Sequence, residues 1–277
     1  MPPFRLVDAF TDAAFAGNPA GVVVLDTPQP VGWMRAIAGE VQASETAFLV
    51  PDTANADTWK LRWFTPTTEV DLCGHATLAA AHVLWQDGLA DLDATLRFTT
   101  RVGDLRARTD QGEILLDLPA WPVRPHPAPA RLEQALRTGG GRYLGRTAGS
   151  AGEDNTGAEQ ANDVVQLPDE TAVRDLRPDL DEVVRLGASG LIVTAPADGE
   201  VDFVSRYFAP TLGVPEDPVT GSAHATLGPW WAEQLGRNDL RARQLSRRGG
   251  RLRVRVDGDR VHVGGLAVTV ITGEVIA

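Results

Sequence analysis

Short apolar runs separated by turn residues fill much of the chain. They are rich in β-branched and aromatic residues and end at Gly, Pro, Asn or Asp, a pattern typical of β-strands. In the first half, predicted strands lie at residues 4–10, 22–25, 46–50, 59–64, 96–100, 105–108 and 113–118. In the second half they lie at residues 191–194, 201–208, 252–256, 261–263 and 267–271. Strands therefore dominate both halves of the predicted structure.

Helical periodicity is confined to a few segments. Apolar positions recur at helical spacing over residues 33–41, with charged residues between them, which predicts a surface helix. Residues 75–86 and 222–235 predict two helices that are apolar on almost every face. Such a helix must be enclosed, and surrounding strands would enclose it. Pro229 lies inside the second one and lacks a backbone donor, so we expect a bend near residues 225–226.

One short motif occurs twice, about half the chain apart. LRWFTPT at residues 61–67 returns as SRYFAPT at residues 205–211. Each copy predicts a strand that enters a Pro turn, and each is followed by a glycine turn at the start of an apolar helix. These turns are CGH at 73–75 and TGS at 220–222. Two related halves, each directing a helix start at a common point, predict a cleft that holds a small anion.

The region between the halves is irregular in composition. Five prolines fall within residues 119–129, which predicts a stiff linker between domains. Residues 139–163 are rich in Gly, Ser, Asn and acidic residues and predict a loop. The expected domains are residues 1–120 and 130–265, with residues 266–277 returning to complete the first.

Composition and charge narrow the function classes. The 277 residues are 43% apolar and 23% charged, as in a soluble globular protein. No run approaches the roughly 18 apolar residues of a membrane span, and the start shows no secretory signal, so a cytoplasmic protein is expected. A net charge of −11 argues against nucleic acid or an anionic membrane as partner. The single cysteine rules out an internal disulfide, and the sequence shows no metal site and no cofactor motif.

The two glycine turns are candidate anion sites. Backbone N–H groups at a helix start lack partners within the helix and carry the positive end of its dipole, so they bind carboxylate or phosphate. Gly74 and Gly221 would let a ligand approach the backbone closely. Either glycine alone would be an ordinary tight turn before a core helix. Their recurrence at equivalent places favours a ligand site.

Glu45 and His75 are candidate proton-transfer groups. Glu45 lies between the surface helix and a strand, and a carboxylate beside an apolar strand can have a raised pKa, which suits an acid/base. The alternative is a solvated turn glutamate. His75 follows Gly74 and could cap the helix, bind a substrate or transfer a proton. A lone histidine is more often structural, and His224 is the other histidine near a glycine turn.

Asp217 and Cys73 flank the same turns. Asp217 lies four residues before Gly221, beside the predicted anion pocket, although Asp-Pro is also a common turn starter. Cys73 precedes Gly74, where a helix start can depress a thiol pKa and make the side chain a base or nucleophile. It could equally be a small buried filler. Thr220 occupies the matching place in the second turn.

In combination, these segments resemble phenazine-biosynthesis (PhzF-like) proteins. The matching motifs are VDAF at 7–10, FAGNPA at 15–20, SETAF at 44–48, FTP at 64–66, CGHAT at 73–77 and EDPVTGSA at 216–223. They occur in order from residue 7 to about residue 235. The resemblance implies an α+β, diaminopimelate-epimerase-like fold. Such a fold has two pseudo-symmetric domains, each a β-barrel-like sheet around a central helix, with the active site between them.

The resemblance also implies roles for the candidate residues. Glu45 would be the proton-shuttling acid/base of a cofactor-free isomerase, with His75 and Asp217 as polar partners. The amides of Gly74, His75, Gly221 and Ser222 would hold a substrate carboxylate. Asn18 would line the same cleft. Related amino-acid epimerases use two opposed cysteines, which Thr220 precludes here. Family members often form homodimers.

Three functional hypotheses follow. The leading one is an isomerase that moves a proton on a small carboxylate-bearing substrate, with Glu45 as acid/base. The second is a thiol hydrolase with Cys73 as nucleophile and His75 or His224 as base. The third is a family member that binds a metabolite or a protein without catalysis. Phenazine production does not follow from the resemblance, because cleft-wall residues would set the substrate.

Overall fold

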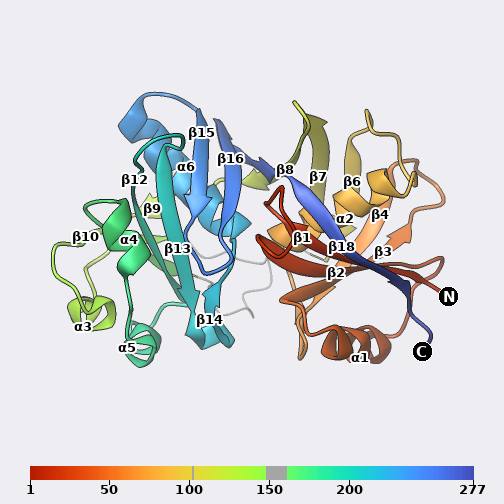
Figure 1. Cartoon of the computed structure of the whole chain (residues 1–277), viewed down its shortest axis with the longest axis horizontal. Helices are drawn as coiled ribbons and strands as arrows, with labels where there is room; N and C mark the ends of the chain where they lie inside the picture. Colours follow the sequence, from red (N-terminus) through yellow and green to blue (C-terminus); the bar gives the residue numbers. More distant parts are fainter. Residues whose placement is uncertain (102, 148–160) are drawn as a thin grey trace. The chain divides into compact units, whose positions relative to one another are not determined.

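The computed structural model describes residues 1–101, 103–147 and 161–277. Its chain forms two compact units, whose elements are labelled in Figure 1. Unit 1 comprises Met1–Leu118 and His262–Ala277, and unit 2 comprises Pro119–Val261. Both units combine strands with a few helices, so the α+β prediction is confirmed.

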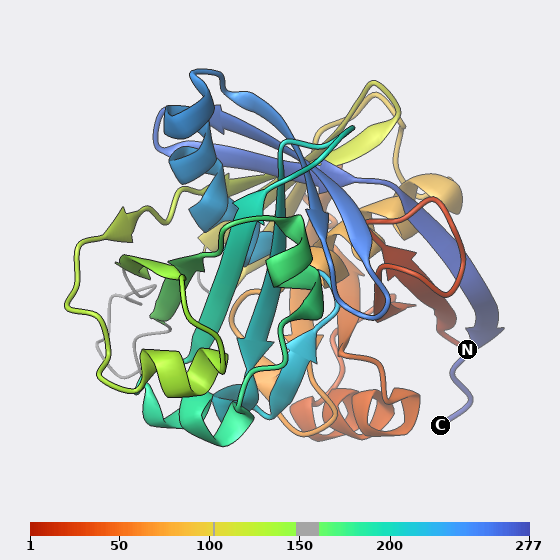
Figure 2. The same ribbon diagram turned by 60° about the vertical axis from the view of Figure 1, so that its left-hand side comes forward.

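Unit 1 holds the strands and helices predicted for the first half, plus the last strand. Its strands are β1 (Pro3–Ala9), β2 (Asn18–Val24), β3 (Glu45–Pro51), β4 (Thr58–Phe64), β5 (Glu69–Val70), β6 (Leu96–Thr100), β7 (Gly103–Asp110), β8 (Glu113–Pro119) and β18 (Ala267–Glu274). Its helices are α1 (Val31–Val41) and α2 (Gly74–Gln86). The ends of the chain lie side by side (Figure 2), because β1 pairs antiparallel with β18 and Pro3 lies opposite Glu274.

Unit 2 has more elements than its sequence pattern predicts. Its strands are β9 (Val123–Arg124), β10 (Arg142–Thr147), β11 (Asn162–Gln166), β12 (Gly190–Pro196), β13 (Phe203–Ala209), β14 (Val214–Asp217), β15 (Asp239–Gln244) and β16 (Gly250–Asp257), followed by β17 (Arg260–Gly265) at the sequence boundary between the units. Its helices are α3 (Leu132–Leu136), α4 (Glu170–Asp175), α5 (Leu180–Arg185), the short 3₁₀ helix η1 (Pro210–Leu212) and α6 (Gly221–Leu235).

The two units share one strand topology. In unit 1, β2 runs parallel to β3, β4 pairs antiparallel with β3 and β5, and β6 adds parallel to β4. In unit 2, β11 runs parallel to β12, β13 pairs antiparallel with β12 and β14, and β15 adds parallel to β13. The main helix follows the fourth strand of each set, α2 after β5 and α6 after β14. The predicted repetition of the plan is therefore confirmed.

The main helix of each unit is packed among strands, which explains its apolar surface. Helix α2 packs against β1, β2, β3 and β18, and Figure 1 shows it among the strands of unit 1. Helix α6 packs against β15 and β16. By contrast, α1 buries one face, through Met34, Ile37 and Ala38, against β3 and β4. Among the described residues, no helix combines the length and apolar character that a membrane crossing requires.

Pro229 does not interrupt α6. The helix runs from Gly221 to Leu235 with the proline inside it. A proline at this position cannot donate to the carbonyl four residues earlier, which belongs to Ala225. The backbone N–H of Trp121 donates to that carbonyl instead, at 3.3 Å. The proline-rich segment thus satisfies the acceptor that the proline leaves open.

Two predictions about the middle of the chain need correction. Residues 119–129, predicted as a stiff linker between domains, belong to unit 2, where β9 pairs antiparallel with β10. Residues 139–163 are not one loop, since β10 occupies the first part and β11 begins at Asn162. The remainder of that predicted loop, residues 148–160, lies outside the described residues. Strand β10 carries Gly and Arg in place of a β-branched run, and its register shift near Gly145 disrupts the alternation a strand would show.

Candidate active site

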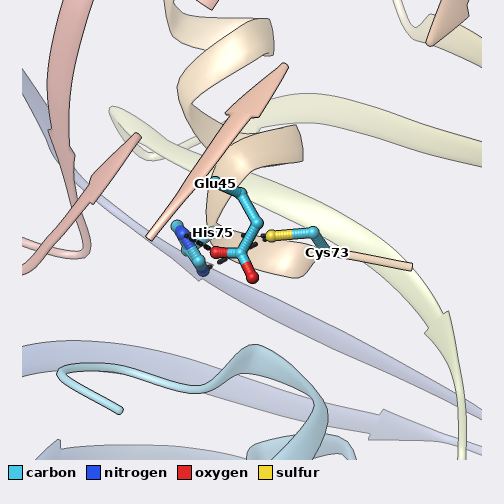
Figure 3. A group of neighbouring side chains, drawn as sticks. All are labelled: Glu45, Cys73 and His75. Carbon is cyan, nitrogen blue, oxygen red and sulfur yellow. Dashed lines mark hydrogen bonds and ion pairs between the residues drawn. The ribbon is translucent and has the colours of Figure 1, made fainter. Parts of the chain in front are cut away.

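Glu45, Cys73 and His75 converge on one point in unit 1 (Figure 3). The Nε2 atom of His75 lies 3.0 Å from Oε2 of Glu45. The Sγ atom of Cys73 lies 3.5 Å from Nδ1 and 3.9 Å from Nε2 of the same ring. Cys73 and His75 are each 5% exposed, whereas the Glu45 side chain is 18% exposed. Glu45 is therefore the most exposed side chain of the trio.

Local structure places each of these side chains. Glu45 is the first residue of β3 and lies opposite Ala20 of the parallel strand β2. Cys73 is the extended N-cap residue of α2, and His75 belongs to its first turn. The Thr77 hydroxyl donates to the carbonyl of Cys73 at 2.6 Å, which anchors the start of the helix. Strand and helix start thus meet at the trio.

Asn18 and Ser44 orient the imidazole ring. Nδ2 of Asn18 lies 3.1 Å from Nδ1 of His75, and the Ser44 hydroxyl donates to Oδ1 of Asn18 at 3.0 Å. In this arrangement Nδ1 accepts a hydrogen bond, so the ring proton sits on Nε2 and faces Glu45. A second proton on Nδ1 requires the Asn18 amide to turn and present its oxygen. Asn18 is fully buried, and its predicted role in lining a cleft stays a prediction.

A glycine fixes the position of Asn18. Gly17 has φ +64°, and a Cβ at this position would lie 2.2 Å from the carbonyl oxygen of Ala9. Only glycine fits both the backbone angle and the space. The chain therefore enters β2 in one fixed direction, with the Asn18 amide against the histidine ring.

Burial and neighbouring charges act in opposite directions on His75. Burial lowers the pKa of the ring, but Cys73 and Glu45 favour the imidazolium and outweigh burial, so the pKa of His75 lies well above its ordinary value. At neutral pH the thiol is uncharged, which leaves the Glu45 carboxylate as the negative partner. The hydrogen bond from Asn18 places a proton on Nε2 of His75, and the raised pKa of the ring keeps that proton bound. Both effects direct a proton at Glu45.

Cys73 is poorly suited to nucleophilic attack. Burial, together with the nearby Glu45 charge, raises the pKa of its thiol to about 11. A thiol must ionise to act as a nucleophile, and catalytic cysteines have depressed pKa values. The helix start does not overcome burial in this case. This geometry weighs against the hydrolase hypothesis.

The second glycine turn is built from hydrogen bonds between neutral groups and Asp217. The Thr220 hydroxyl donates to Oδ2 of Asp217. Gln244 of β15 accepts from the Thr220 backbone N–H at 2.9 Å and donates to the Asp217 carbonyl at 2.7 Å. Ser246 donates to the carbonyl of Pro218 at 2.7 Å. The turn before α6 is therefore fastened to β15 and the residues that follow it.

His224 is a structural residue of unit 2. It is fully buried, its Nδ1 lies 2.8 Å from the Thr220 carbonyl, and its Nε2 lies 3.2 Å from the Ser205 hydroxyl. The ring stacks on Phe203 with centroids 5.8 Å apart. Burial lowers its pKa to about 4, so it is neutral at physiological pH. It lacks the access that a catalytic base needs.

The predicted amide donors occupy matching positions. Gly74 and His75 open α2, and Gly221 and Ser222 open α6. In the described structure, neither N-cap residue caps its helix with a side-chain hydrogen bond. The role of the first-turn amides as donors to an anion stays a prediction.

The residues predicted for the site fall into both units. Unit 1 contains Asn18, Glu45, Gly74 and His75, and unit 2 contains Asp217, Gly221 and Ser222. The sequence analysis missed two residues that hold the turns. Ser44 directly precedes Glu45 in the SETAF motif, and this position next to a candidate residue could have identified it. Gln244 lies far downstream on β15, without any local signal.

Comparisons with known proteins agree with this architecture. A family model described as phenazine biosynthesis-like protein matches residues 7–273. A relative from Halalkalibacterium halodurans, named an uncharacterized isomerase, is 41% identical over 276 residues, covering 99% of this chain and 98% of the relative. The crystal structure of a PhzF-family phenazine biosynthesis protein from Enterococcus faecalis has a TM-score of 0.87 at 39% identity, covering 100% of this chain and 99% of that chain.

The fold extends to more distant proteins. A hydroxyproline epimerase from Agrobacterium vitis matches with a TM-score of 0.61 at 12% identity, covering 98% of this chain and 91% of that chain. That likeness concerns the fold alone and identifies it as epimerase-like. With the family match over nearly the whole chain, it follows that this chain belongs to the phenazine biosynthesis-like protein family.

Proposed function

We propose that this protein is a cofactor-independent isomerase that moves a proton between carbon atoms of a small carboxylate-bearing metabolite. Glu45 is the acid/base. The observation that carries the proposal is the contact between the partly exposed Glu45 side chain and the buried His75, at the start of α2. The isomerase named among the relatives supports the same class of reaction.

The proposed reaction uses one proton and no change of oxidation state. A Glu45 oxygen accepts a proton from an activated carbon of the substrate, so that the C–H bond breaks and an O–H bond forms. The electron pair delocalises into the substrate, and Glu45 then returns the proton to another carbon. Nε2 of His75 contacts Oε2 of Glu45 and favours the ionised form of the carboxylate. This contact orients the other carboxylate oxygen, which carries the proton.

Substrate binding falls to the helix starts. The amides of Gly74 and His75 are proposed to bind a substrate carboxylate in unit 1, as helix N-termini do for anions. The corresponding amides of Gly221 and Ser222 are proposed as the second anion-binding turn. Asp217, held by Thr220, is proposed to contact a polar group of the substrate. In this arrangement, backbone N–H groups bind the carboxylate of the substrate, and Glu45 is free to take the proton from the reacting carbon atom.

The test is deuterium uptake from heavy water. Purified protein is incubated with a panel of cyclic and acyclic amino-bearing carboxylic acids, and carbon-bound deuterium is measured by mass spectrometry and NMR. The Glu45→Gln variant should lose about two to four orders of magnitude in the exchange rate, because it removes the acid/base group. Glu40→Gln, on the exposed side of α1, is the matched control and should exchange normally.

Two results would oppose the proposal. A folded Glu45→Gln protein that exchanges at the wild-type rate would remove Glu45 from the chemistry. Tight binding of an acid without any exchange would instead identify a metabolite-binding member of the family.

A further inference from the structure

The trio at the start of α2 has the composition of a metal site. Glu45, Cys73 and His75 each offer one ligand atom, and these atoms all lie within 4.8 Å of one another. Thiolate, imidazole and carboxylate are the three side-chain ligands that zinc uses in proteins. A soft sulfur ligand beside an imidazole favours Zn²⁺ over Mg²⁺ or Ca²⁺, which prefer oxygen.

We propose that these three side chains bind one divalent zinc-class ion, which occupies the candidate active site in place of a substrate. The function proposed above includes no metal. The structure therefore assigns the trio a second ligand, and the ion would be an inhibitor and not a cofactor.

The distances suit a tetrahedral ion. Zinc–ligand bonds of about 2.0 to 2.3 Å place tetrahedral ligands about 3.3 to 3.6 Å apart. The His75 Nε2 to Glu45 Oε2 distance is 3.0 Å, and the Cys73 Sγ to His75 Nε2 distance is 3.9 Å. Shifts of a few tenths of an ångström in flexible side chains would bring both into that range. Three protein ligands leave the fourth position for water, on the side where Glu45 is partly exposed.

Glu45 Oε2 offers a ready lone pair. The atom is buried and, within the described part of the chain, accepts no well-aligned hydrogen bond, although His75 Nε2 lies close to it. An ion between these two atoms would satisfy the buried oxygen and use the ring nitrogen as a ligand. A cation bound by one thiolate and one carboxylate also has no net charge, which suits a mostly buried position.

Binding needs two proton rearrangements. The S–H bond of Cys73 breaks as the zinc–sulfur bond forms, and the proton leaves to solvent. The Nε2 proton of His75 is lost as the zinc–nitrogen bond forms, and the ligating ring carries its remaining proton on Nδ1, where that proton needs an acceptor. Asn18 supplies one if its amide turns to present Oδ1, and the Ser44 hydroxyl can then accept from the Asn18 amide nitrogen. Ligating histidines ordinarily have such a partner on the other ring nitrogen.

The predicted consequence is inhibition of the isomerase, which rests on the function proposed above. An ion on Glu45 Oε2 neutralises the carboxylate that would accept the substrate proton and replaces its contact with His75. Zinc at saturating concentration should therefore abolish deuterium exchange, and a chelator should restore it.

Direct binding is measured without any substrate. Metal-stripped full-length protein is titrated with Co²⁺ as a spectroscopic probe, and with Zn²⁺ in competition with a chromophoric chelator. One Co²⁺ per chain should give a sulfur-to-cobalt charge-transfer band in the near ultraviolet and tetrahedral visible bands. Cys73→Ser should remove the charge-transfer band, and Cys73→Ser and Glu45→Gln should each weaken zinc binding at least about tenfold. His126→Gln, an exposed histidine outside the trio, is the matched control.

The outcomes separate the two proposals. The metal site would be overturned if folded Cys73→Ser protein kept its zinc affinity, or if the cobalt complex of the wild type lacked the sulfur band. It would also be overturned if His126→Gln lost as much zinc affinity as the variants of the trio. Circular dichroism of every variant checks folding, and Glu45→Gln and Cys73→Ser test the site independently of each other. A protein that binds zinc through the trio but exchanges no carboxylic acid would sustain the metal site and remove the proposed isomerase.

Discussion

The first turns of α2 and α6 occupy the same place in a repeated topology, but they carry different chemistry. The turn of α2 holds a thiol and an imidazole against the Glu45 carboxylate. At the turn of α6, the Thr220 hydroxyl donates to Asp217 and the Gln244 side chain of β15 accepts from the Thr220 backbone N–H. One topology thus carries a cluster of ionisable groups at one helix start and a hydrogen-bonded, mostly neutral turn at the other. Under the proposed function, the first turn supplies the acid/base and the second supplies fixed binding geometry.

The histidines of the two helices show the same contrast. His75 has a carboxylate neighbour, and its pKa is raised despite burial. His224 has a carbonyl and a hydroxyl as neighbours, and burial lowers its pKa to about 4. Two buried imidazoles therefore differ because only one has a negative partner to offset desolvation.

The repeated motif itself pairs an arginine with a glutamate in both units. Arg62 of β4 binds Glu69 at 2.7 Å, and Arg206 of β13 binds Glu216 at 2.6 Å. Each guanidinium also lies over a phenylalanine two residues later. The Arg62 side chain is 36% exposed, but that of Arg206 is 8% exposed. Arg206 additionally donates to carbonyls at the end of α4, those of Val173, Arg174 and Leu176.

The largest effect is expected from breaking the buried copy of this pair. Arg206→Met leaves Glu216 and several carbonyls without their donor, and should lower the free energy of unfolding by about 3 to 5 kcal/mol. Arg62→Met should cost less than about 1 kcal/mol, because a partly exposed pair is screened by water. Urea unfolding of both variants measures the difference. Equal losses would show that burial does not distinguish the two copies.

An effect of intermediate size is expected from acid acting on His224. Its folded pKa of about 4 lies below the unfolded value near 6.5, so its contribution to stability is complete above pH 6.5 and is lost as the pH falls toward 4. The loss should approach about 1.4 kcal/mol per pH unit in that window. His75 acts in the opposite sense: its raised pKa stabilises the fold below pH 6.5, and that contribution is lost as the pH rises through the folded value.

Unfolding measured at pH 7, 6 and 5 tests the His224 contribution. In His224→Gln the acid-dependent slope should be smaller than in the wild type, and His126→Gln should keep the wild-type slope because its side chain is exposed. An unchanged slope in His224→Gln would mean that the buried ring takes up its proton while the protein is folded.

The smallest effect is expected from Pro229, which distinguishes α6 from α2. An interior proline ordinarily costs a helix about 3 kcal/mol. Because Trp121 already donates to the carbonyl of Ala225, Pro229→Ala should change the free energy of unfolding by less than about 1 kcal/mol. The same urea assay measures it. A gain of several kcal/mol would show that the Trp121 bond does not compensate.

Local sequence patterns predicted the helices and strands that are buried along a continuous surface. Strand β3 and helix α2 lie within two residues of their predicted bounds, because period and composition follow from burial on a continuous surface. Strands β10 and β15 were missed. In β15 three charged residues alternate with Leu240 and Ala242, and two apolar residues are too few to indicate that one side of the strand is buried.

The candidate site was likewise predictable from the sequence only in part. The identities of Glu45 and His75 and the glycine before the histidine were visible in the sequence and in its resemblance to a family. The 3.0 Å contact between the two side chains was not, nor was the 3.5 Å distance from the Cys73 Sγ atom to the histidine ring. A resemblance transfers residue types, whereas a distance between groups on different elements depends on how those elements pack.

The sequence by itself determined the repeat, the enclosed helices, the negative net charge and the family, because each is a property of neighbouring residues or of composition. Only the tertiary structure decided which of these side chains lie in contact. Parallel pairing of β2 with β3 carries Asn18 and Glu45 to the start of α2, where burial raises the pKa of Cys73, and where Cys73 and Glu45 together raise that of His75 against its burial. Electrostatic effects of this kind depend on distance and burial, and both are set by contacts between segments far apart in the chain.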